Sequence, residues 1–364
     1  MISILQRYML VQTLAGLGIA TAIISSVILL VDFVEQTRDI STRVDISALE
    51  LLRLTSFRAP SLIETTLPFI LLFGVLTSLF RLNRQSEIVV MRGSGVSAWR
   101  ILAAPMVLSV VIGLLGAMVL NPLGAAGNAI FERERDILMN VERDPDSVQP
   151  VWLREANVDG YTVIVAEDLR ENQQQLIQTA FLYFDVGPDG VPSMSRRIDA
   201  PTAVLQDGFW EIEAAVERVP EAAATDLGRI TIPTGINRQA LFERARSPEG
   251  VSFWDFPALI ASAREAGLAT ERYELRYHSL MALPLTLLAA TLIAAAATMR
   301  LHRLGGAAGF AAAGGLAGFV MFFLQELLSS VGAAGSLPPA TAAWSAPAIT
   351  ALLALTYIAS TEDG

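Results

Sequence analysis

The sequence predicts an α-helical membrane protein in which six transmembrane helices, in two groups of three, flank a β-rich domain outside the membrane. Hydrophobic residues make up 53% of the 364 residues, charged residues only 17%, and the mean hydropathy is +0.49. Soluble proteins carry about 25% charged residues. Residues 121–276 hold 26 acidic residues and 15 arginines, so their net charge of −11 accounts for the −10 of the whole chain. The remainder is nearly neutral and apolar, as membrane-spanning segments are.

Six stretches are long and apolar enough to cross a bilayer, which takes about 20 residues of helix. They are Tyr8–Val31, Ala59–Phe80, Ile101–Ile130, Tyr277–Met299, Leu304–Ser330 and Leu337–Ala359. The first is longer than the apolar run of about 7–15 residues in a signal peptide, and no small-residue cleavage site follows it. In the third, Asn121-Pro122 is expected to mark the exit from the membrane.

The arginines predict the orientation, because cytoplasmic loops of membrane proteins carry more positive charge than outer loops. Six spans put both termini on one side. With the N-terminus inside, seven arginines lie in inner segments and four in the outer short loop. The inner set is Arg7, Arg81, Arg84, Arg92, Arg100, Arg300 and Arg303, and the outer set is Arg38, Arg43, Arg53 and Arg58. We therefore expect cytoplasmic termini and an acidic middle segment outside the cytoplasm.

The acidic middle segment has the pattern of short β-strands joined by tight turns. Asp-Gly pairs occur at 159–160, 189–190 and 207–208, each between apolar or β-branched runs such as Tyr161–Val165. Asp-Gly tolerates the positive φ angles of tight hairpins. Several strands at this spacing predict a sandwich or jelly roll. A charged helix over Phe131–Glu142 and an amphipathic helix over Phe253–Gly267 are expected to flank it.

Residue types that the chain lacks exclude several kinds of chemistry. There is no cysteine, and the two histidines stand apart, so neither a disulfide scaffold nor a histidine-based triad or zinc site is expected. Every positive charge is an arginine, and a Walker A loop needs a lysine on the phosphates. We expect no metal, no cofactor and no enzymatic activity; any ATP must be hydrolysed by another subunit. The acidic charge gives no support for nucleic-acid binding.

The loop between the second and third spans is the strongest candidate functional segment. It reads as a short cytosolic helix that starts at Ser86-Glu87 and stops at Gly93 and Gly95, and such a helix suits a groove on a partner protein. An interfacial helix that merely caps two spans is the alternative. The candidate coupling residues are Ser86, Glu87, Ile88, Val89, Val90, Met91, Arg92, Gly93 and Gly95. Ile88, Val89 and Met91 would fill the groove, and Glu87 and Arg92 would pair at its rim.

Two acidic residues, Glu64 and Glu326, fall near the outer ends of their spans. An ionisable group inside a membrane is costly and often functional. Their position favours the simpler interpretation that both reach lipid headgroups or water.

The run from Ser86 to Gly95 resembles the signature of the lipopolysaccharide export permeases, LptF and LptG. The resemblance covers the whole chain: Arg7-Tyr8 opens it, and Leu67-Pro68 followed by Gly74 marks the second span. It implies six spans, a periplasmic β-jellyroll and a location in the bacterial inner membrane. It also implies a heterodimer with an LptF-type subunit, a cytosolic LptB-type ATPase dimer, LptC-type and LptA-type bridge proteins, and lipopolysaccharide as the substrate.

Three short stretches resemble the G type of this family more than the F type. These are Val31–Gln36, Tyr277–Leu280 and Leu337–Pro339. The expected domains are residues 1–130, with three spans and a coupling helix at about 84–97; residues 131–270, with the periplasmic β-jellyroll-like domain and its flanking helices; and residues 271–364, with the last three spans. A lipoprotein-releasing permease would instead carry its large domain after span one. From another class, a non-transporting membrane scaffold that displays the β domain is the alternative.

The outer end of the first span is the expected lipid-binding region. G-type proteins can carry a lysine there for lipid phosphates, whereas this sequence has Asp32. We expect Arg38 and Arg43 to meet an anionic glycolipid, because the planar guanidinium can donate two hydrogen bonds to a phosphate. The alternative is that Arg38 pairs with Glu35 or Asp39.

Overall fold

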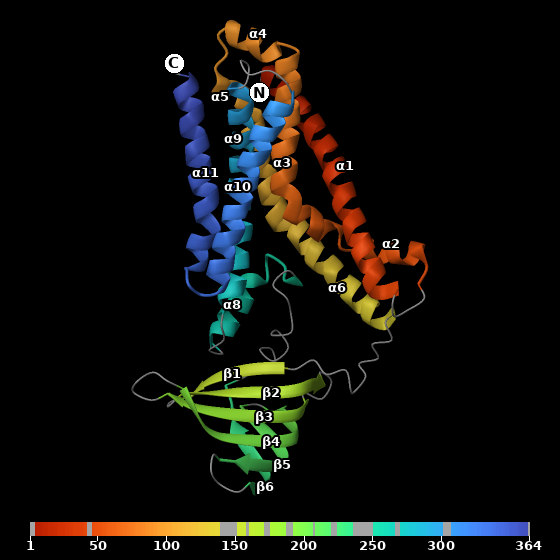
Figure 1. The fold of residues 1–364 in the computed structure, drawn as a ribbon, viewed down its shortest axis with the longest axis vertical. Helices are drawn as coiled ribbons and strands as arrows, with labels where there is room; N and C mark the ends of the chain where they lie inside the picture. Colours follow the sequence, from red (N-terminus) through yellow and green to blue (C-terminus); the bar gives the residue numbers. More distant parts are fainter. Residues whose placement is uncertain are drawn as a thin grey trace. The chain divides into compact units, whose positions relative to one another are not determined.

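In the computed structural model, the chain divides into two compact units (Figure 1). Unit 1 comprises residues 1–135, 248–256 and 271–364, and unit 2 comprises residues 136–247 and 257–270. The structure describes residues 4–41, 46–138, 151–157, 160–170, 175–186, 192–206, 208–219, 224–235, 250–265, 270–300 and 307–362. Unit 1 is helical, and the strands belong to unit 2.

Unit 1 contains the six predicted spans. In the described part of the chain, six helices are long and apolar enough to cross a membrane. The elements are α1 (Ile4–Ser41), α3 (Ala59–Arg84), the continuous run of α5 (Ala98–Leu115), the π-helix η1 (Gly116–Leu120) and α6 (Asn121–Leu138), then α9 (Glu271–Arg300), α10 (Ala307–Ala333) and α11 (Pro339–Glu362). The prediction of six spans in two groups of three is confirmed.

Helix α9 packs against α3, α5, α10 and α11 and so organises the helical unit. Its buried side chains are small or aliphatic, among them Leu287, Ala289, Ala290 and Leu292. Short side chains let neighbouring backbones approach closely, which is how helices associate where no water drives apolar burial. Helix α1 packs instead on α3 and α5.

At Asn121-Pro122, the expected exit of the third span from the membrane, the helix itself is not interrupted. The helix continues to Leu138, and the π-helical turn Gly116–Leu120 directly precedes the proline. A proline removes one backbone donor and crowds the preceding turn. The wider π turn accommodates it without a break, and such turns are frequent at functional sites.

Three short helices complete the described helical elements: α2 (Ala48–Ser56), α4 (Glu87–Gly93) and α8 (Phe256–Glu265). The sequence interpretation did not include α2. Ser47 and Glu50 form a capping box at its start, in which each side chain meets the other's backbone amide.

Unit 2 carries one antiparallel sheet in which each strand pairs with its sequence neighbours, in the order β1-β2-β3-β4-β5-β6. The strands are β1 (Val151–Asn157), β2 (Gly160–Arg170), β3 (Gln175–Val186), β4 (Pro192–Gln206), β5 (Phe209–Arg218) and β6 (Thr225–Pro233). The predicted β domain is confirmed. Among the described strands, no crossover connection of the jelly-roll kind interrupts this up-and-down order.

Two of the three Asp-Gly turns can be located by their glycines. Gly208, with a φ of +85°, lies between β4 and β5, where Gln206 pairs with Phe209. Gly160 begins β2 and pairs with Asn157 at the end of β1. Asp159, Asp207 and the pair Asp189-Gly190 lie outside the described residues. The strand ends beside Gly160 and Gly208 therefore agree with the hairpins predicted at the first and third Asp-Gly pairs.

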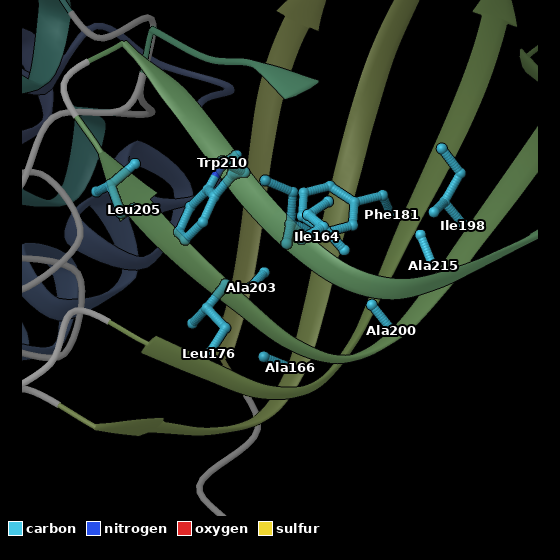
Figure 2. Close-up of a cluster of buried hydrophobic side chains, with 11 residues drawn as sticks. Ile164, Ala166, Leu176, Phe181, Ile198, Ala200, Ala203, Leu205, Trp210 and Ala215 are labelled. Carbon is cyan, nitrogen blue, oxygen red and sulfur yellow. The ribbon is translucent and has the colours of Figure 1, made fainter. Parts of the chain in front are cut away.

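The core of the β domain gathers on one face of the curved sheet (Figure 2). Trp210 and Phe181 are fully buried, and their rings meet edge to face with centroids 6.2 Å apart. Smaller residues from β2, β3, β4 and β5 fill the space around them. A one-residue slip in strand pairing would move these two aromatic side chains to the opposite face of the sheet. Their burial therefore favours the observed register.

Candidate functional site

The candidate coupling segment forms helix α4, between the C-terminal end of α3 and the N-terminal end of α5. It begins after Ser86, whose φ of +60° turns the chain, although the Ser86 side chain makes no capping hydrogen bond. It ends at Gly93, and Gly95 with a φ of +87° reverses the backbone before Ser97 caps α5. The glycine stop signal in the sequence therefore marks the true end of the helix.

The side chains of α4 are accessible, and none of them is buried. Val90 is 69% exposed and Val89 is 47% exposed, whereas Ile88 and Met91 are half-buried. Behind the helix lies a pocket of about 390 Å³, lined by Ile88, Val89, Arg92 and Gly93 together with residues of α3, α5 and α9. Val90 is thus the most exposed of the apolar residues of α4. Ile88, which was predicted to contact a partner, instead lines the pocket beside α3, α5 and α9.

Glu87 already has a partner within the chain. The hydroxyl of Tyr8 on α1 donates a hydrogen bond of 2.5 Å to Oε2 of Glu87, and Nε2 of Gln12 donates to the Tyr8 hydroxyl at 3.1 Å. Two residues before Tyr8, Nε2 of Gln6 donates to the carbonyl of Arg100 at 2.6 Å. The start of α1 is therefore hydrogen-bonded to the first residue of α4 and to the first turn of α5. Sequence reasoning had assigned Glu87 to a partner protein and had missed Tyr8.

At the other end of α1, Asp32 is buried and forms an ion pair with Arg58. Arg58 precedes α3, and its guanidinium lies 5.0 Å from the centroid of the buried Phe131 ring on α6. Arg58 is thus the cation that faces Asp32. Of the two predicted lipid-binding arginines, Arg38 is exposed in the last turn of α1, and Arg43 lies outside the described residues.

A second polar cluster joins three spans, and its centre is Glu64. This residue is only 4% exposed, so the interpretation that it reaches headgroups or water is wrong. Its Oε1 accepts a hydrogen bond from Arg276 on α9 at 2.7 Å, and its Oε2 accepts from Nδ2 of Asn121 at 3.1 Å. Burial of a carboxylate at this depth is tolerable because a cation and an amide satisfy both of its oxygens. Glu326, by contrast, is exposed, as expected.

The Glu64 cluster also fixes the segment that returns from unit 2. Oδ1 of the buried Asn121 accepts from the backbone amide of Phe253 at 2.7 Å, and Nε1 of Trp254 donates to the carbonyl of Met118 at 3.1 Å. Met118 belongs to the π-helix, where wider turns leave backbone carbonyls free for such a partner. Residues before α9 are thereby anchored to the third span.

No residue set with catalytic chemistry emerges from the described part of the chain. Within it, no group of three or more His, Asp or Glu side chains could hold a metal ion. The polar contacts described above join helices to one another. They are suited to positioning and to transmitting movement, and the outward face of α4 is suited to contacting another protein.

Comparison with known proteins identifies one family. A family model described as lipopolysaccharide export system permease LptF/LptG matches residues 7–360, which is nearly the whole chain. No curated protein matches the sequence.

Proposed function

The chain belongs to the lipopolysaccharide export permease family LptF/LptG, and we propose that it is the transmembrane subunit of an ABC transporter that extracts lipopolysaccharide and delivers it to a periplasmic bridge. The match over residues 7–360 carries this proposal, because it spans all six membrane helices and the β domain. Membership makes the chain a multi-pass inner-membrane protein and a transporter subunit. The family model covers both types, so the assignment to the G type stays a prediction.

The proposed orientation has both termini in the cytoplasm and the β domain in the periplasm. The arginine distribution supports it, as does the course of the third span: α4 adjoins one end of this 38-residue helix, and the chain continues into unit 2 from the other. A reporter fused after Gly364 should be active only in the cytoplasm. One inserted near Asp189 should be active only in the periplasm. The opposite pattern at either site would overturn the orientation.

In this proposal the partners follow from the family. An LptF-type subunit completes the permease, an LptB-type dimer supplies ATP hydrolysis, and LptC-type and LptA-type proteins accept the lipid. The absence of lysine from the chain supports a separate ATPase, because this subunit cannot form a Walker A loop. Arg38 and Arg43 are proposed to meet the lipid phosphates, and crosslinking from position 38 to lipopolysaccharide would test that contact.

Helix α4 is the proposed docking site for the ATPase. Its exposed valines, on a cytosolic turn between two spans, support this role over that of an interfacial cap. Burial of one valine side chain contributes about 1.5–3 kcal/mol, so a charge at that position should weaken association by about tenfold or more. A scaffold that only displays a β domain has no need of such a contact.

The decisive experiment is co-purification of the ATPase with Val90→Asp and Met91→Asp variants of the full chain. Leu49→Asp gives a matched control, because Leu49 is 77% exposed on α2, at the opposite end of the spans. We expect the α4 variants to lose the ATPase and the control to retain it. Full ATPase retention together with full lipopolysaccharide release from proteoliposomes in both α4 variants would contradict the docking role.

A further inference from the structure

Helix α1 is a long, unbroken helix that lies at the surface of unit 1, with most of its apolar length not buried. It contains no proline over its 38 residues, whereas α3, α5, α9 and α11 each have a proline in the helix interior. Sharp bends in long helices occur mostly at proline, so α1 can move without bending. Much of its apolar surface faces outward, as Ile23, Val27 and Leu30 illustrate.

Helices α1 and α3 make a close backbone contact at a pair of glycines. A Cβ atom on Gly16 would come within 2.3 Å of the carbonyl oxygen of Gly74, and a Cβ on Gly74 would lie 2.9 Å from Cα of Leu17. The two backbones therefore touch at this crossing. The side chains of Leu17 and Ser78 pack beside this backbone contact. The crossing is therefore the point where α1 is held most directly against α3, and it can serve as a fulcrum about which α1 tilts.

The two ends of α1 are held by polar contacts of different kinds. Near its start, Tyr8 and Gln6 bond to Glu87 of α4 and to the carbonyl of Arg100. Near its other end, Asp32 is paired with Arg58. Tyr8 lies eight residues before Gly16 and Asp32 lies sixteen residues after it. At a rise of about 1.5 Å per residue, the two arms measure roughly 12 Å and 24 Å.

From this arrangement we infer that Tyr8 is a positioning residue that transmits movement of α4 to α1, and that α1 acts as a lever about the Gly16–Gly74 crossing. The inference rests on the proposed docking of an ATPase to α4. A displacement of the Glu87 carboxylate pulls the Tyr8 hydroxyl with it, because hydrogen bonds to charged groups are short and strong. The unequal arms then roughly double that displacement at Asp32, where the ion pair with Arg58 must yield.

The inference assigns Glu87 a role different from pairing with the ATPase itself. Removal of the Tyr8 hydroxyl should leave the outward face of α4 intact, so ATPase association should persist while the movement no longer reaches α1. In the assembled transporter, we expect Tyr8→Phe to reduce lipopolysaccharide released per ATP hydrolysed by about tenfold, the effect of losing a hydrogen bond to a charged group. Glu87→Ala combined with Tyr8→Phe should add little further loss.

Tyr357→Phe is the matched control, since Tyr357 lies near the C-terminal end of α11. Unchanged release per ATP in Tyr8→Phe would overturn the inference. Loss of ATPase association in Tyr8→Phe would overturn it as well, because Tyr8 would then serve to build the docking face. Failure of the proposed function gives a different result: Val90→Asp would then retain the ATPase.

A second experiment tests the outer arm directly and does not depend on Tyr8. The chain contains no cysteine, so cysteines at positions 32 and 58 can be joined selectively by a short, reducible bifunctional thiol reagent. Joining them should stop lipopolysaccharide release while the ATPase remains bound, and reduction should restore release. The same variant before crosslinking is its own control. Release at the uncrosslinked rate from crosslinked protein would show that this end of α1 does not move during export.

Discussion

The buried pair of Glu64 and Arg276 predicts a large and specific loss of stability when one partner is removed. Glu64 accepts hydrogen bonds from Arg276 and from Asn121 and is almost completely buried. Glu64→Ala leaves a guanidinium without its counter-ion, and breaking a buried pair in this way costs about 3–5 kcal/mol. Because 25% of the Arg276 side chain is exposed, we expect a value near the lower limit, about 3 kcal/mol.

Thermal unfolding of the full chain in detergent, followed by tryptophan fluorescence, measures this loss. At about 2–4 °C per kcal/mol, Glu64→Ala should lower the melting temperature by roughly 10 °C. Glu326→Ala is the control, because Glu326 is an exposed carboxylate near the end of another span, and it should change stability by less than about 0.5 kcal/mol. Glu64→Gln should be intermediate, since its amide oxygen can still accept a hydrogen bond.

Replacement of both charges distinguishes a broken ion pair from a simple packing defect. An apolar pair of similar volume is often as stable as a buried ion pair. Glu64→Met with Arg276→Met should therefore recover most of the stability that either single change loses, apart from about 1 kcal/mol for the amide that Asn121 then leaves unpaired. A double variant no more stable than the single ones, or a Glu64→Ala variant as stable as Glu326→Ala, would refute the reasoning.

Three further predictions concern packing and titration. Gly74→Ala should destabilise the chain by about 1–3 kcal/mol through overpacking. Gly18→Ala should not change stability, because its added Cβ meets nothing within 4 Å. A lower melting temperature for Gly18→Ala than for Gly74→Ala would contradict this prediction. Trp210→Ala should cost about 3–5 kcal/mol and make the β domain of the full chain protease-sensitive, unlike a change at the exposed Phe209. Burial raises the pKa of Tyr183, so the β domain should lose stability as pH rises above the ordinary tyrosine pKa of about 10, and Tyr183→Phe should lessen that loss in alkaline unfolding curves.

The elements that the sequence predicts correctly are those encoded by neighbouring residues. A span is a run of about 20 apolar residues, and a hairpin needs only a turn residue such as Gly208 between alternating strands. Helix α4 ends where Gly93 and Gly95 indicate. The start of helix α2 is also encoded locally, because Ser47 and Glu50 have the spacing of a capping box. The sequence interpretation did not use this pattern.

The features that the sequence alone does not give are those that depend on a partner far along the chain. Asn121-Pro122 has the composition of a helix exit, but the π turn before it and the bonds of Asn121 to Glu64 and Phe253 keep the helix intact. The sequence around Glu64 predicts a contact with headgroups, because its partner Arg276 lies 212 residues later in the chain. The sheet likewise takes an up-and-down order that the turn signals alone do not specify.

The polar contacts that matter most for the proposed mechanism share the property that no single-sequence pattern encodes them. Tyr8 and Glu87 are 79 residues apart, and Asp32 and Arg58 are 26 apart across two helices. Each pair joins an end of α1 to another element, and between them α1 packs on α3 at the Gly16–Gly74 crossing. Polar groups are common at the ends of membrane helices, where the hydrocarbon ends. The distinguishing feature of α1 is that Tyr8 and Asp32 bond to other elements of unit 1. These contacts connect both ends of α1 to other elements, which the inferred lever requires, so the inference depends on the pattern of contacts more than on any one residue.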